Sequence, residues 1–186
     1  ITSFFMEESD QETQNRTRAV LEELKSAGAS VVDLKLPESF QTAVQDQLLI
    51  MGVEAAAFHK PMYEKQAQDY RPKLREMLRQ GLETGATTYS KALERRLQFS
   101  ADMKALSEQV DVLLTPSTPT APLADLTNTG DTRFQGPWTS CGLPTITLPA
   151  GLAESGLPMG IQLIAPPFEE ARLLAIARWC EKVIDV

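Results

Sequence analysis

Cysteine and histidine are scarce in this sequence, which removes several classes of site. The two cysteines, Cys141 and Cys180, cannot build a disulfide framework and lack the CxxC spacing of a metal site. The single histidine, His59, precedes Lys60 and Pro61 at the expected end of a helix, where the helix dipole favours its cation. We therefore expect no histidine mechanism and no metal site. Two free thiols indicate a reducing, cytoplasmic setting.

Basic charge and long apolar runs are also missing. The chain has 18 Lys and Arg residues against 25 Asp and Glu residues, so no basic stripe can displace counterions from a phosphate backbone. No apolar run approaches the roughly 20 residues that cross a bilayer. Residues 1–5 lack the basic region that opens a signal peptide. We expect neither a nucleic acid nor a membrane as a direct partner.

What is present is enough apolar sequence for one core: 42% of 186 residues are hydrophobic. The first part has the pattern strand, helix, strand. Residues 1–6 predict a short strand, and Ser9-x-x-Glu12 predicts a capping box that opens a helix. Gly28 predicts the end of this helix, and apolar alternation over Val31–Leu36 predicts a half-buried strand. The expected unit is βαβ-like.

The middle of the chain is predicted to form three helices, at Phe40–His59, Pro72–Gln80 and Thr88–Glu108. Pro61 ends the first of these helices and Gly81 ends the second. The apolar run Asp111–Thr115 predicts a buried strand. A loop rich in proline and threonine follows over Pro116–Arg133, and loops of this length are commonly functional.

The C-terminal part is predicted to contain a short helix, a β-hairpin and a final helix. The helix occupies Phe134–Cys141, and two strands, Thr145–Leu148 and Met159–Ile164, flank the turn Glu154–Gly156. The last helix, after Pro166, has an expected inward face of Leu173, Leu174, Ile176, Ala177, Cys180 and Ile184. The pattern is that of an α/β protein.

Two Gly-Leu-Pro turns, at Gly142 and Gly156, lead into the hairpin strands. With the surrounding stretch, FQGPWTSCGLPTITLPAGLAESGLPMGIQLI, they resemble the C-terminal signature of the amidase-signature hydrolases, which cleave amides with a serine nucleophile. The run DVLLTP ending at Pro116, the Pro/Thr loop to Pro122 and the Phe168-Glu-Glu ending resemble the same family. Many relatives have Asn three places before the first Gly-Leu-Pro glycine, where this chain has Thr139.

The resemblance implies a mixed β-sheet flanked by helices, the C-terminal portion of the amidase-signature fold. It implies that residues 1–186 form one partial domain and that the catalytic N-terminal half is absent. Because the chain also begins at Ile1 without an initiator Met, we expect it to be cut from a longer protein. The missing half is then its first expected partner.

Relatives of this kind use a serine nucleophile, a second serine, a proton-shuttling lysine and a Gly-rich loop that binds the oxyanion. No serine of this chain lies in a Gly-Gly-Ser or Gly-x-Ser-x-Gly motif. The sequence therefore contains no motif that would activate a serine hydroxyl. We expect no catalytic residue here and an inactive chain. The resemblance implies that the whole enzyme hydrolyses a carboxylic amide to an acid and ammonia or amine, without metal or organic cofactor.

Three other interpretations stay open. The chain can belong to the amidase subunit of a tRNA-dependent glutaminyl amidotransferase, to a catalytically dead binding module, or to an allophanate-hydrolase-like protein.

The expected substrate-binding residues are few. Thr118 lies in the Pro/Thr loop, which matches the loop beside the substrate pocket of the resembled family; a rigid, solvent-facing loop is the alternative. Arg75 matches a segment that supplies a substrate-facing arginine in some relatives; a solvated helix arginine is the alternative. Phe134, Trp138 and Cys141 share one helix face and form either an apolar substrate wall or core.

Gln162 is expected to satisfy backbone groups inside the sheet. The expected partners are a small-molecule amide, the missing half, and a second copy of the chain, because half a sheet should expose apolar surface and unpaired strand edges.

Overall fold

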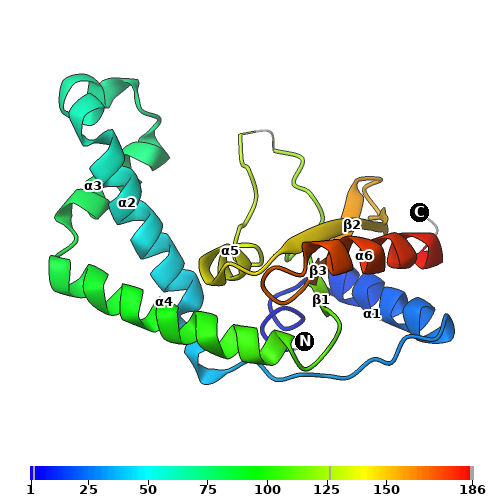
Figure 1. The fold of residues 1–186 in the computed structure, drawn as a ribbon. Helices are drawn as coiled ribbons and strands as arrows, with labels where there is room; N and C mark the ends of the chain where they lie inside the picture. The colour runs from blue at the N-terminus through cyan, green and yellow to red at the C-terminus, as the bar shows by residue number, and fades with distance from the viewer. Residues whose placement is uncertain (2, 126, 185–186) are drawn as a thin grey trace.

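The computed structural model describes residues 1, 3–125 and 127–184. The chain has two parts: a small sheet with helices on both faces, and a helical arm that extends away from it (Figure 1). The arm consists of α2 (Ala43–Gln66) and α3 (Pro72–Glu83), and the long helix α4 (Ala86–Ser107) leads back from it to the sheet.

The sheet has three strands in the order β1-β3-β2, so β3 is central. They span β1 (Leu113–Pro116), β2 (Thr145–Leu152) and β3 (Pro158–Ile164), and both pairs are antiparallel. The predicted class, an α/β fold with a sheet flanked by helices, is confirmed. The described strands are all antiparallel, whereas the resemblance implied a mixed sheet.

Each face of the sheet is buried by different elements. Helices α1 (Gln11–Ser26) and α6 (Glu170–Ile184) cover one face with an aliphatic core that includes Val20, Leu24, Ile161, Leu163, Leu173 and Ala177. Helix α4 and the short helix α5 (Gly136–Cys141) cover the other face with an aromatic core of Phe5, Phe40, Phe99, Phe134 and Trp138. Alternate residues of β3 point into the two cores, as the period of a strand requires.

The arm depends on close backbone packing between α2 and α3. A Cβ atom built on Gly81 would lie 2.1 Å from the carbonyl oxygen of Gly52 and 2.8 Å from Cβ of Ala56. Only a glycine permits this approach. Gly81, predicted to end α3, therefore lies inside it as the contact point of two helices.

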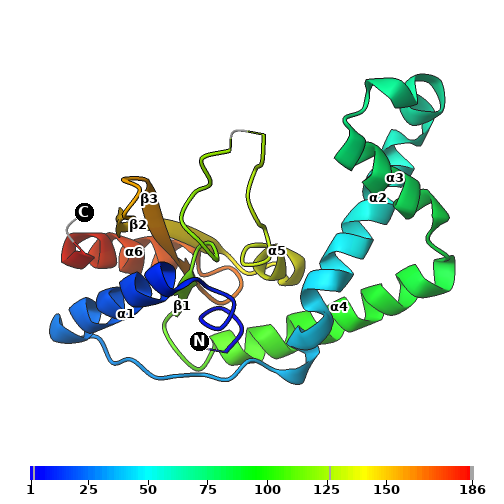
Figure 2. The same cartoon turned by 180° about the vertical axis from the view of Figure 1, so that it is seen from behind.

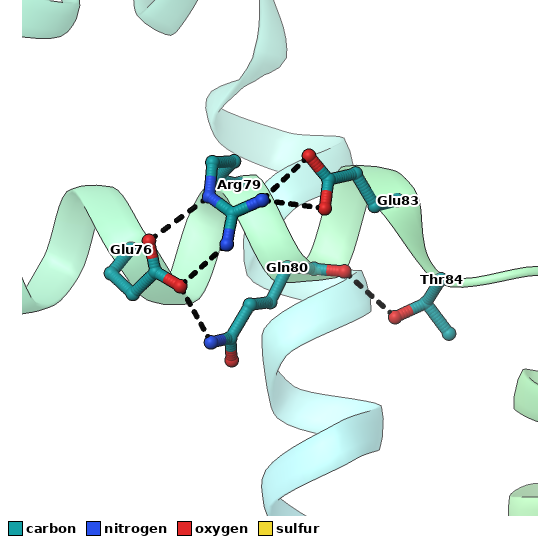
Figure 3. Close-up of polar contacts among 5 residues, drawn as sticks. All are labelled: Glu76, Arg79, Gln80, Glu83 and Thr84. Atoms are coloured by element: carbon teal, nitrogen blue, oxygen red, sulfur yellow. Dashed lines mark hydrogen bonds and ion pairs between the residues drawn. The ribbon is translucent and has the colours of Figure 1, made fainter.

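The exposed side of α3 carries a polar network centred on Arg79 (Figure 3). Its guanidinium donates to the carboxylates of Glu76 and Glu83, one turn away on either side, and Gln80 also donates to Glu76. The hydrogen bonds from Arg79 lower the pKa of Glu76 to about 2. These i,i+3 and i,i+4 pairs support a helix that has few buried residues.

The predictions for the first ten residues are wrong in two respects. Residues 3–8 form turns instead of a strand, because the rings of Phe4 and Phe5 pack into the aromatic core. The helix is capped by Asp10, whose carboxylate accepts from Thr13 N at 2.8 Å, while the Ser9 hydroxyl donates to Phe5 O. A carboxylate cap also gains from the helix dipole, so it competes well with a hydroxyl.

The segment Val31–Leu36 is extended but pairs with no described strand, so the second predicted strand is also not formed. Side chains decide two further differences. Helix α2 continues through Pro61 to Gln66. Tyr63 and His59 of its last turns both pack against the ring of Tyr70, which lies beyond the end of the helix. Leu174 is 59% exposed because the buried stripe of α6 follows Leu173, Ala177, Cys180 and Ile184.

The remaining predicted helices, strands and turns are found within a few residues of their expected bounds. Among the residues described, no helix combines the length and the apolar character needed to cross a membrane.

Candidate functional site

The buried amide of Gln162 joins the parts of the chain that lie around the expected pocket. Its Nε2 donates to Thr115 Oγ1 at 3.0 Å, to Pro116 O at 3.3 Å and to Phe134 O at 2.9 Å. These contacts link β3 to the end of β1 and to the segment before α5. The predicted structural role of Gln162 is confirmed.

The Pro/Thr loop leaves β1 at this point and is held on both sides. Gln135 donates from its side chain to Ser117 O, and Ser117 N donates to Gly160 O at 3.0 Å. Pro119 O accepts from Asp10 N at 2.9 Å, which fastens the loop to the start of α1. Thr118 is half-exposed on this loop, and its hydroxyl donates to Thr120 O at 2.8 Å.

Helix α5 spans Gly136–Cys141, and its C-cap residue, Gly142, takes a positive φ of 71°. Phe134 and Trp138, for which a substrate wall and a core position were both open, are buried in the aromatic core. The Trp138 ring stacks on Phe5 at a centroid distance of 5.3 Å, and its Nε1 has no hydrogen-bond partner among the described residues. The two rings thus pack into the core beneath α5.

Cys141 lies half-buried at the end of α5. Burial raises the pKa of its thiol to about 11, so the thiol is neutral at physiological pH. Its Sγ lies 3.6 Å from Trp138 O. This position agrees with an apolar wall residue and not with a nucleophile.

Arg75 lies apart from the other predicted site residues. It belongs to α3 in the arm, which lies apart from α5 in both views (Figures 1 and 2). The Pro/Thr loop does reach toward α3, because the pKa of Asp125 is lowered by hydrogen bonds from Thr127 and also by the charge of Lys73. The guanidinium of Arg75 is exposed and reaches Tyr70 O at 3.5 Å. The structure thus brings Thr118, Phe134, Trp138 and Cys141 to one region and leaves Arg75 outside it.

A cleft of about 360 Å³ lies between α2, α4 and α5. The exposed Thr139 and the half-buried Ser140 of α5 line it, opposite Gln47 and Glu54 of α2 and Arg96 of α4. None of these residues was predicted as a site residue. The one sequence signal was Thr139, which occupies the position where many relatives of the resembled family have Asn.

Several of the described serine hydroxyls are engaged in structural contacts. Ser9, Ser100 and Ser107 donate to backbone carbonyls of their own helix or turn. Ser39 donates to the Asp102 carboxylate at 2.6 Å, which joins the short helix before α2 to α4. A carboxylate is too weak a base to activate serine without a second group. Among the described residues, no hydrogen bond joins a serine hydroxyl to a histidine or lysine side chain.

The fold is that of an α/β protein with a small antiparallel sheet flanked by helices. Comparison with known proteins gives the family: the family model for amidases matches residues 1–174. The chain belongs to the amidase family.

The relatives give the scale of the match. The chain is 29% identical to a glutamyl-tRNA(Gln) amidotransferase subunit of Synechococcus sp. (strain RCC307), over 98% of this chain and 44% of that protein. It is 28% identical to an amidase of Pseudomonas putida, over 97% and 41%. A crystal structure of an amidase superimposes with a TM-score of 0.87 at 26% identity, over 96% and 43%. The chain therefore spans less than half the length of these relatives.

Proposed function

We propose that the chain is the C-terminal part of a serine-dependent amidohydrolase, which converts a carboxylic amide to an acid and ammonia or amine. The observation that carries this proposal is the amidase family match, which extends over residues 1–174. The chain nevertheless covers only 44% of the length of the Synechococcus relative. The seryl nucleophile, the second serine and the lysine then belong to the rest of the polypeptide.

The reaction proceeds in two steps. The serine oxygen attacks the amide carbon, the tetrahedral oxyanion collapses, and the amine leaves with a proton delivered by the lysine-linked relay. Water then hydrolyses the acyl-enzyme and releases the acid. Developing negative charge requires preorganised donors, which the Gly-rich loop of the other part supplies. This chain contributes the opposite wall.

On that wall we assign substrate contacts to Thr118 of the Pro/Thr loop and to Cys141 at the edge of α5. Phe134 and Trp138 hold α5 in position from the core. Arg75, on the arm, reaches a substrate only if the remaining polypeptide carries that substrate toward α3. The partners on this proposal are an amide of small size and the remaining part of the protein, in the reducing cytoplasm that the free cysteines favour.

A fluorophosphonate probe tests the proposal, because it labels only an activated serine. We expect no labelling of the 186-residue chain and stoichiometric labelling of the longer polypeptide that contains it. Labelling of the short chain would disprove its inertness. An unlabelled long polypeptide that still binds amides would instead identify a catalytically dead binding module.

The relative from Synechococcus favours a second candidate, the amidase subunit of a tRNA-dependent amidotransferase. The two candidates differ in the acceptor of the released ammonia. Such a protein, assembled with its partner subunits, would pass ammonia from glutamine to a glutamyl-tRNA, whereas an amidohydrolase releases ammonia to solution. Measurement of glutaminyl-tRNA formation separates them.

A further inference from the structure

The cleft between α2, α4 and α5 contains a cation that no described side chain neutralises. Helix α4 carries two neighbouring arginines, Arg95 and Arg96. The guanidinium of Arg95 forms a two-point ion pair with the carboxylate of Asp46 on α2, at 2.8 Å and 2.5 Å. Arg96 lines the cleft and is half-buried, yet within the described part of the chain its guanidinium makes no hydrogen bond and no ion pair. Arg96 is therefore available to a ligand.

The ion pair of Arg95 also fixes where Arg96 lies. Asp46 is only 5% exposed, so separating the pair would leave a buried carboxylate without a partner, at a high cost in free energy. Burial opposes the ionisation of Asp46, but hydrogen bonds from Arg95 and Thr42 and the charge of Arg95 lower its pKa. The pair is thus intact at neutral pH and holds α4 against α2. In this arrangement the next side chain along α4 stays at the cleft.

Three further polar groups of the cleft can donate hydrogen bonds to an anion. Ser140 and Thr139 of α5 carry hydroxyls, and Gln47 of α2 carries an amide. The Thr139 hydroxyl donates to Gln135 O at 3.3 Å, whereas the Ser140 hydroxyl and the Gln47 amide make no hydrogen bond among the described residues. A guanidinium binds a carboxylate through two parallel hydrogen bonds, and hydroxyl and amide donors can satisfy its other lone pairs. This set of groups is suited to a carboxylate.

The acidic residue of the cleft, Glu54, has a partner of its own. Its Oε1 accepts from the Tyr89 hydroxyl at 3.1 Å. Partial burial of this phenol and its hydrogen bond to Glu54 raise the pKa of Tyr89, and the charge of Arg96 opposes the shift. Arg96 therefore lies close enough to act on Tyr89 without pairing with Glu54. Because a ligand carboxylate is attracted by Arg96 and repelled by Glu54, we expect it to lie against α4 and α5.

The rest of the lining is apolar and indicates the shape of the ligand. Ile50, Met51 and Ala55 of α2 form this part. The volume of about 360 Å³ is typical of sites for small molecules and fits a carboxylate joined to a short carbon chain. On α5, Ser140 is followed directly by Cys141, to which we assign a substrate contact. Such a carbon chain can therefore run from the cleft to the wall of the pocket.

We propose that the cleft binds a carboxylate of the substrate and that Arg96 is its main ligand. The substrate class is then an amide that also carries a carboxylate, with a short apolar chain between the two groups. This inference rests on the proposed function, in which the chain forms one wall of an amidohydrolase pocket. Because a monoamide of a dicarboxylic acid and the diamide of the same acid differ by one charge, Arg96 should distinguish them.

Pairs of amides that differ by this charge test the proposal on the longer polypeptide that contains the chain. Succinamate, glutaramate and adipamate carry the carboxylate at increasing distance, and the diamide of each acid is its neutral counterpart. Counted per amide group, we expect kcat/KM to favour the carboxylate over its diamide for at least one of the three lengths. The preference should arise mainly from a lower KM, because binding that is equal in the substrate and the transition state changes KM.

Substitutions on α4 locate the preference. Arg96→Gln removes the charge, and the ratio of kcat/KM between the carboxylate and its diamide should fall at least about tenfold, because a pair of charge-assisted hydrogen bonds is lost. Arg96→Lys keeps the charge without the two-point geometry and should give an intermediate ratio. Lys91→Gln removes an exposed charge from the same helix, outside the cleft, and should keep the original ratio.

Glu54→Gln removes a repelling charge from the cleft and should raise the same ratio. A fall would show that the cleft binds a cationic group, and would overturn the proposal. The proposal also fails if Arg96→Gln lowers kcat/KM equally for both amides of a pair, since Arg96 then supports the fold and not the carboxylate. It fails as well if none of the three lengths shows a preference for the carboxylate.

Calorimetric titration of the same polypeptide with these amides measures binding without turnover and so separates this inference from the proposed function. Arg96-dependent binding of a carboxylate amide by a polypeptide that the fluorophosphonate does not label would refute the amidohydrolase and retain the carboxylate subsite. A labelled polypeptide that binds each diamide as tightly as its carboxylate counterpart would retain the amidohydrolase and refute the subsite.

Discussion

At the scale of single residues, burial sets the chemistry of the side chains near α5. The Cys141 thiol is held neutral by burial, with its pKa raised to about 11. The pKa of Cys180, under α6, is raised by the same cause. Both thiols therefore behave as small apolar groups at neutral pH.

Alkylation of Cys141 by iodoacetamide should follow this pKa. In the folded chain we expect the rate to rise about tenfold per pH unit from pH 8 until it levels off near pH 11, because only the thiolate reacts. In urea the rate should level off near the ordinary pKa of 9.0. Peptide mass spectrometry separates Cys141 from Cys180.

The same shift has a consequence for stability. A pKa raised on folding stabilises the native state below pH 9, and this contribution is lost as the pH rises from about 9 through about 11. Cys141→Ala should lack that loss. A folded-state alkylation rate that levels off at pH 9 would contradict the burial of the thiol.

Single residues were predictable where one physical demand dominates. Gln162 stands in an apolar strand, so its amide had to meet buried polar groups. Asp10 and Ser9 are both good cap residues. The Asp10 carboxylate caps the helix, while the Ser9 hydroxyl donates to the carbonyl of the buried Phe5, a contact that the sequence does not reveal. The cleft residues on α2 and α4 could not be predicted, since their helices meet α5 only in three dimensions.

At the scale of elements, the arm depends on the crossing of α2 and α3 at Gly52 and Gly81. The substitution Gly81→Ala should destabilise the chain by about 1–3 kcal/mol, because the added Cβ meets backbone atoms that cannot rotate away. Urea unfolding followed by circular dichroism measures the loss. Lys73→Ala, exposed on the same helix, should leave the midpoint nearly unchanged. Equal midpoints for the two variants would show that the two helices can separate enough to admit a methyl group.

Most elements could be predicted because their pattern is local. The hairpin strands β2 and β3 pair with each other across a short turn, so their apolar runs are sufficient. The predicted strand at residues 31–36 has no strand partner among the described residues, and alternation alone does not specify whether a partner is within reach. The error at residues 1–6 has another cause, because the rings of Phe4 and Phe5 pack into the aromatic core and residues 3–8 form turns.

At the scale of the whole molecule, apolar side chains lie exposed on the arm and beside the sheet. Phe58 and Leu97 are 73% and 69% exposed on α2 and α4, and Phe168 is 93% exposed before α6. These side chains offer apolar surface to a second copy of the chain or to another polypeptide.

We expect the isolated chain to associate as its concentration is raised, as a dimer or larger species, and to bind a dye specific for apolar surface. Light scattering coupled to size exclusion gives the mass. The longer polypeptide should bind less dye per chain. A compact monomer that binds no dye would contradict the exposure of these surfaces.

The three hydrogen bonds of Gln162 have a mechanical consequence. The amide of Gln162 binds both the first residue of the Pro/Thr loop and the segment that precedes α5, so a shift of either segment relative to β3 breaks a hydrogen bond. A substitution at the exposed Thr139 therefore changes the side chain on the surface of α5 while the segment that leads into this helix stays in place.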